Sequence, residues 1–66
     1  MGKHEFELSD DEKIVIGILQ NQESIQIDLL YFKSGLSSSA VASALLMLEM
    51  KGLVMSLPGK VYAIRP

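Results

Sequence analysis

Few residues of this 66-residue chain have the types and the spacing that chemistry requires. His4 is the only histidine, and the chain has no cysteine. A metal site or a general base needs partner side chains at a fixed spacing, and the sequence offers His4 no such set. It also contains no glycine-rich run of the kind that cradles phosphates. We therefore expect no enzymatic activity, no cofactor and no metal.

Three consecutive carboxylates, Asp10, Asp11 and Glu12, come nearest to an acidic cluster. Ser9 precedes them, and the Ser-x-x-Glu spacing is a capping box. In this motif the Ser9 hydroxyl and the Glu12 carboxylate each accept a hydrogen bond from the other residue's amide. Negative charge is also favourable at the positive end of a helix dipole. We interpret all three as residues that start a helix.

The helices are predicted from apolar spacing and from the residues that begin and end them. The first is expected over residues 10–20. Its apolar stripe consists of Ile14, Val15, Ile18 and Leu19. Residues 25–27 predict a short strand, and a second helix then begins at Asp28. Gly35 ends that helix, because glycine adopts the left-handed conformation without a Cβ penalty.

The third helix is capped by Ser37 or Ser38 and continues to Lys51, before a stop at Gly52.

A β-hairpin follows it. Residues 53–57 and 60–64 are β-prone runs on either side of Pro58-Gly59. Pro-Gly favours a type II turn, whereas the tightest hairpins use primed turns, so we expect a loop of three or four residues. This order of elements is that of a winged helix, a mostly helical α+β fold with a helix-turn-helix core and a hairpin wing. We expect a single domain at residues 8–66, behind a flexible tail at residues 1–7.

Two motifs stand near the C-terminal end. Leu-x-Leu-Glu-x-x-Gly-Leu-Val at residues 46–54 occurs in many winged helices, and Leu-Pro-Gly-Lys-x-Tyr at residues 57–62 is the more specific motif. With these motifs, residues 8–12, 27–30, 34–37, 41–54 and 57–62 resemble the C-terminal winged-helix domain of the DNA-processing protein A family, called DprA or Smf.

The resemblance implies a domain that follows a larger nucleotide-fold domain in its parent protein. It implies a parent that handles incoming single-stranded DNA in natural transformation and passes it to the recombinase. The family's winged helix is described as an accessory that binds duplex DNA or a partner. The expected partners are the parent's nucleotide-fold domain, a second copy in a homodimer, or a recombination protein.

The charge is unevenly distributed. Residues 1–28 hold seven acidic and two basic residues, whereas residues 29–66 hold four basic and one acidic. This asymmetry favours a nucleic-acid partner for the second half. The candidate DNA contacts are Ser37, Ser38, Ser39, Lys33, Lys51 and Lys60. Each has a structural alternative: the serines cap a helix, Lys33 and Lys51 stand at negative helix ends, and Lys60 solubilises a turn.

The third helix lacks the side chains that read bases. At 100° per residue its core face is Val41, Ala44, Leu45 and Leu48. The opposite face consists of Ser39, Ser43, Leu46, Met47 and Met50. That face has no Arg, Lys, Asn or Gln, the usual partners of base edges.

The apolar triplet on this opposite face, Leu46, Met47 and Met50, is a candidate protein interface. The alternative is that the hairpin covers part of it or that Leu46 belongs to the core. Whether Met55 and Phe32 extend it depends on packing that the sequence does not specify.

Three functions follow from these features. The first is an accessory domain that acts mainly through protein contacts, and the second is weak, non-specific binding of duplex DNA. The third, a stand-alone transcription regulator, is disfavoured because base-reading side chains are absent. No apolar run approaches the roughly 20 residues that span a bilayer, and the acidic start is unlike a signal peptide. We therefore expect a cytoplasmic domain with no membrane partner.

Overall fold

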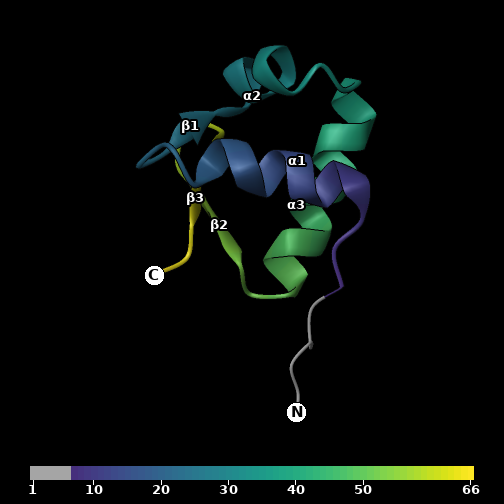
Figure 1. The fold of residues 1–66 in the computed structure, drawn as a ribbon. Coiled ribbons are helices and arrows are strands. Elements are labelled where there is room, and N and C mark those ends of the chain that lie inside the picture. Colours follow the sequence, from purple (N-terminus) through teal and green to yellow (C-terminus); the bar gives the residue numbers. More distant parts are fainter. Residues whose placement is uncertain (1–6) are drawn as a thin grey trace.

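The computed structural model describes residues 7–66, which fold into three helices and a three-stranded antiparallel sheet (Figure 1). The elements are α1 (Asp10–Leu19), β1 (Ile25–Gln26), α2 (Ile27–Ser34), α3 (Ser38–Met50), β2 (Val54–Leu57) and β3 (Val61–Ile64). The prediction of a winged helix is confirmed. Of the expected tail at residues 1–7, only Glu7 lies among the described residues, and His4 lies outside them.

Helix α1 begins with the predicted capping box. The Glu12 amide donates to the Ser9 hydroxyl at 3.2 Å, and the Ser9 amide donates to Glu12 Oε1 at 2.9 Å. The predicted apolar stripe is wrong at one position, because Ile14 is 40% exposed. The buried residues of α1 are Glu12, Val15 and Leu19. The buried side of α1 therefore includes position 12, so the Glu12 carboxylate lies against the rest of the fold.

The turn between α2 and α3 has the expected left-handed glycine. Gly35 has a φ of 70°, and its amide donates to the Tyr31 carbonyl at 3.2 Å. Ser37, rather than Ser38, caps α3, since its hydroxyl accepts from the Ala40 amide at 3.1 Å. Helix α2 starts at Ile27, one residue earlier than predicted, and β1 is correspondingly shorter.

Helix α3 ends in a Schellman motif. The Gly52 amide donates to the Glu49 carbonyl and the Leu53 amide to the Leu48 carbonyl, both at 3.0 Å. Gly52 has a φ of 79°, which only glycine adopts without strain. Leu53 packs against the core cluster that contains Leu48, as is usual for this motif. The motif directs the chain from α3 into β2.

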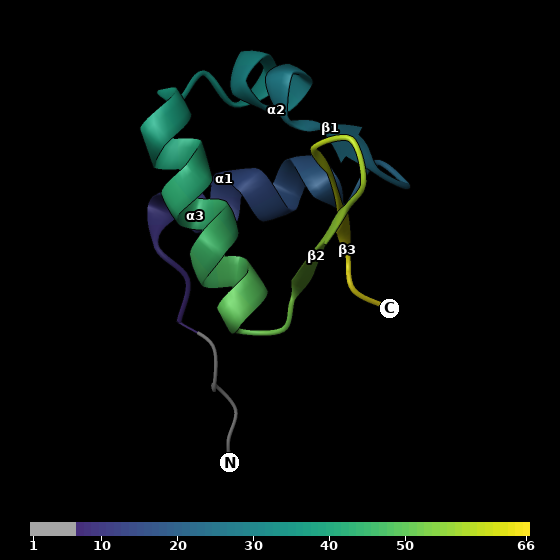
Figure 2. The ribbon, with the colours of Figure 1, turned by 180° about the vertical axis from the view of Figure 1, so that it is seen from behind.

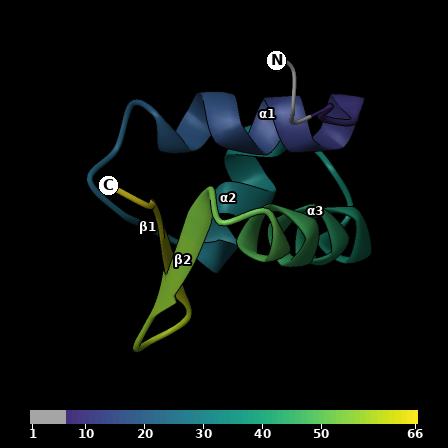
Figure 3. The same ribbon diagram turned by 90° about the horizontal axis from the view of Figure 1, so that it is seen from below.

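The sheet has the order β1-β3-β2, so the short strand pairs with the hairpin. Leu57 pairs with Val61, which leaves a three-residue loop, as expected. Gly59 has the positive φ (86°) that the third position of a type II turn requires, and Lys60 is also left-handed, with a φ of 59°. The hairpin projects to one side of the helices (Figure 3).

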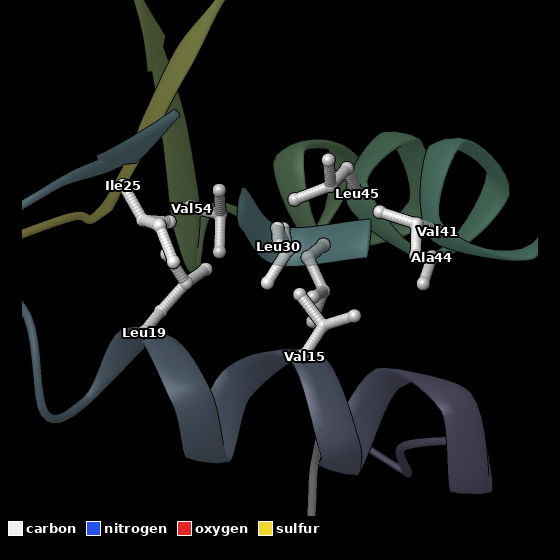
Figure 4. Packing of buried hydrophobic residues seen from close by; sticks show 9 residues of the cluster. Val15, Leu19, Ile25, Leu30, Val41, Ala44, Leu45 and Val54 are labelled. Atoms are coloured by element: carbon white, nitrogen blue, oxygen red, sulfur yellow. The ribbon is translucent and has the colours of Figure 1, made fainter. Parts of the chain in front are cut away.

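One hydrophobic core joins the helices to the sheet. Val15 and Leu19 project from α1 toward Leu30 of α2 and the buried residues of α3 (Figure 4). The predicted core face of α3 is confirmed. Its members are Val41, Ala44, Leu45 and Leu48, all at most 4% exposed. Ile25 and Val54 bring the sheet into the same cluster.

Candidate functional site

The outward face of α3 carries the exposed apolar triplet. Leu46 is 56% exposed, Met47 41% and Met50 73%. Met50 is a surface neighbour of both others, since it lies four positions after Leu46 and three after Met47 on a helix whose opposite side is buried in the core. Ser39 and Ser43 are exposed farther toward the N-terminal end of the same helix. The hairpin leaves the triplet exposed, and Leu46 does not belong to the core.

This face offers hydrogen-bonding groups only near its N-terminal end. Ser39 and Ser43 each carry one hydroxyl, and the triplet that follows carries none. Glu49, half-buried on the flank, would repel phosphates. The arrangement favours contact with an apolar or adaptable surface over the reading of base edges.

The serines at the start of α3 are partly occupied by capping. The Ser37 hydroxyl accepts from Ala40 and lies 3.3 Å from the Ser39 hydroxyl. All three serines, Ser37, Ser38 and Ser39, are exposed. They stand at the positive end of a 13-residue helix, where an anion is favoured.

Two candidate lysines lie at opposite ends of α2. Lys33 is exposed in its last turn. Lys60 is exposed in the wing loop, and its carbonyl accepts a hydrogen bond from the Ile27 amide at the start of α2. The view from behind shows this loop next to α2 (Figure 2). The backbone of Lys60 therefore lies beside the start of α2, and Lys33 lies near its end.

The third candidate lysine is engaged within the fold. Lys51 Nζ lies 2.9 Å from Glu12 Oε1 and 3.0 Å from the Glu7 carbonyl oxygen. The hydrogen bonds from Lys51 and from the Ser9 amide lower the pKa of Glu12, and burial opposes them. The side chain of Lys51 is 22% exposed, so a phosphate would have to compete with this carboxylate.

A second exposed apolar surface was not predicted. Leu29 is 45% exposed and Phe32 83% exposed on the outer side of α2. Met55 is half-buried in β2. Helix α2 has four apolar or aromatic residues in succession, residues 29–32, and it is too short for their spacing to identify its outer side.

The described residues, 7–66, contain no surface pocket and no group of three or more side chains that could hold a metal ion. Within the same part of the chain, no single helix is long and apolar enough to cross a membrane. Only α2 and α3 taken together have the length and composition of a membrane-spanning segment, and the two helices are bent by 112° relative to each other.

Comparison with known proteins gives one family. The model of the DprA winged helix domain matches residues 3–60. No curated protein and no solved structure matches the chain.

Proposed function

Because the chain belongs to the DprA winged helix domain family, we propose that it is the accessory domain of a bacterial protein that processes DNA in uptake, natural transformation and recombination. It acts in the cytoplasm, mainly through protein contacts. It carries no catalytic step of its own.

The composition of the α3 outward face carries this proposal. In helix-turn-helix proteins this face enters the major groove. Here its C-terminal half is Leu46, Met47 and Met50, which have no donors or acceptors that match base edges. Methionine side chains are flexible and polarizable, so they suit a surface that packs against another protein.

The partner is a protein surface with exposed apolar side chains. The nucleotide-fold domain of the parent protein is the first candidate, and a recombination protein and a second copy of this domain are the others. A contact with the parent domain fits an accessory role, since a tethered domain binds at a high effective concentration.

The test replaces the two methionines. Met47→Lys with Met50→Lys should reduce binding to the separately purified nucleotide-fold domain at least tenfold, measured by calorimetry. Gln20→Lys with Gln22→Lys adds the same two charges at exposed positions after α1; it is the matched control and should bind as the parent sequence does. Unchanged binding by the double variant would remove the triplet from the interface.

Weak binding of duplex DNA is the second candidate, and the exposed Lys33 and Lys60 favour it. Two lysines can neutralise only a few phosphates. Each phosphate neutralised contributes about 0.9 to the magnitude of the slope of log affinity against log salt concentration. Amide NMR titration with a short duplex at low and at physiological salt tests this. Shifts at Ser37, Ser38, Ser39 and Lys60 that fade with salt support DNA binding, and no response excludes it.

A further inference from the structure

Methionines supply all the sulfur of this chain, and two of its four lie on the outward face of α3. The chain has no cysteine, so its thioethers are the groups that a peroxide oxidises most readily. Met47 and Met50 belong to the exposed triplet, whereas Met55 is half-buried in β2. Met1 lies outside the described residues. Among the described residues, peroxide should therefore act first on the α3 face.

Met50 is the more accessible of the two methionines on this face. It is 73% exposed and Met47 is 41% exposed. They are neighbours on one side of α3, since three positions separate them. Because the oxidation of a sulfur follows its exposure, Met50 should react before Met47.

Met50 has no hydrogen-bond donor among its nearest neighbours along the chain. The side chains three and four positions away on either side are all apolar, and they are Leu46, Met47, Leu53 and Val54. The backbone amides of residues 51–53 already donate to carbonyls within the end of α3. Among these neighbours a sulfoxide oxygen at position 50 finds no donor, so water must supply its hydrogen bonds.

Met47 differs, because two of its neighbours carry donors. The Ser43 hydroxyl lies four positions before it, and the Lys51 ammonium lies four positions after it. A sulfoxide at Met47 therefore lies beside side chains that can donate to it, although Lys51 is also bonded to Glu12. Oxidation should therefore change the binding properties of the face more at Met50 than at Met47.

We propose that Met50 is an oxidation site, and that its oxidation by a hydroperoxide releases the protein bound to the α3 outward face. The sulfur donates an electron pair to one peroxide oxygen. The S–O bond forms, the O–O bond breaks, and the second oxygen leaves as water after it takes up the proton of the first. The thioether is oxidised by two electrons, and the peroxide is reduced by two.

The release rests on the proposed function, since it concerns the same face. An apolar partner surface cannot donate to the new oxygen, so binding of the oxidised chain would take that oxygen out of water without compensation. Methionine sulfoxide reductases reverse the oxidation, so the release is reversible. The redox state of one side chain therefore decides whether the face binds.

The order of oxidation is the first test. The folded chain is treated with hydrogen peroxide, and the gain of one oxygen at each methionine is followed by peptide mass spectrometry. Met50 should react faster than Met47, and Met47 faster than Met55. Equal rates for Met50 and Met55 would overturn the proposal, because exposure would then not control the reaction.

Binding is the second test. After peroxide treatment the chain should bind the separately purified nucleotide-fold domain about tenfold more weakly in calorimetry, and sulfoxide reductases should restore the affinity. Met50→Leu keeps an apolar side chain of similar volume without an oxidisable sulfur. This variant should bind as the parent sequence does and keep its affinity after peroxide. Met47→Leu is the matched control, and peroxide should still weaken its binding.

The outcomes separate the oxidation site from the proposed function. Equal affinity before and after oxidation overturns the inference alone, and so does a loss of affinity that Met50→Leu does not prevent. An untreated chain that fails to bind overturns the proposed function, and the release with it. Thermal melts of the treated and untreated chains complete the test. Unfolding on oxidation would also overturn the inference, since the loss of binding would then not come from the face.

Discussion

Lys51 Nζ and the Ser9 amide both donate to the same oxygen, Glu12 Oε1, each at 2.9 Å. Lys51 caps the C-terminal end of α3, and Glu12 lies in the first turn of α1, so one carboxylate joins the first helix to the last. The Glu12 side chain is only 6% exposed. The residue therefore serves both as half of a capping box and as the partner of a distant cation.

Removal of the cation should destabilise the domain more than neutralisation of the acid does. Lys51→Met leaves a buried carboxylate with only the Ser9 amide, which should lower the free energy of unfolding by about 1–3 kcal/mol. Glu12→Gln preserves the capping box, since glutamine also fits this position, and should cost about 1 kcal/mol. Urea denaturation of both variants measures the difference. Equal losses would mean that the charge of Glu12 has no role beyond the hydrogen bond.

The same pair predicts acid lability. The hydrogen bond from Lys51, with that from Ser9, holds the pKa of Glu12 below its usual value in the folded state. A lowered pKa contributes stability that is complete above the unfolded value of about 4.3 and is lost as the pH falls through the folded value. Between about pH 6 and the unfolded pKa value, Glu12 adds almost no pH dependence to the free energy of unfolding. Glu12→Gln should therefore lose less stability than the parent sequence on acidification, and parallel curves would contradict this assignment.

The order and type of every element could be predicted from local sequence. Ser9 and Glu12, Gly35, and the Pro58-Gly59 pair each specify a start, an end or a turn within a few residues of themselves. The core face of α3 could also be predicted from the sequence, because a 13-residue helix is long enough for its apolar spacing to identify the buried side.

The errors concern contacts between residues distant in sequence. The α1 stripe was misplaced at Ile14 because Glu12, a charged residue, takes an inner position that apolar counting cannot assign. The ion pair of Glu12 with Lys51 spans 39 positions, and no local pattern indicates it. Phe32 could not be placed because α2 has eight residues and apolar side chains on both sides.

Two Gly→Ala substitutions should change stability in opposite directions. Gly17 lies within α1 and Gly52 lies after α3, and an added Cβ would meet nothing within 4 Å at either position. Only the backbone differs, because Gly52 has a φ of 79°. Gly17→Ala should raise the free energy of unfolding by about 0.5–1 kcal/mol, and Gly52→Ala should lower it by about 1 kcal/mol or more. Chemical denaturation measures both, and the same sign for the two would refute the assignment of the Schellman motif.

The surface methionines should not matter for folding. Met47 and Met50 are 41% and 73% exposed, so Lys at both positions should change the free energy of unfolding by less than about 0.5 kcal/mol each. A thermal melt provides the check. A larger loss would show that the double variant tests folding and not the interface.

Lys60 combines a charge with a strained backbone, and its substitutions should separate the two. Its φ of 59° lies in the left-handed region, which asparagine tolerates and β-branched residues do not. Lys60→Asn should leave stability within about 0.5 kcal/mol, whereas Lys60→Val should lower it by about 1–2 kcal/mol. If Lys60 contacts DNA, Lys60→Asn should also reduce the salt slope by about 0.9. Stability comes from denaturation curves and the slope from binding at three salt concentrations. A reduced slope with unchanged stability assigns the effect to the ammonium group, because the asparagine variant keeps the wing loop as it is.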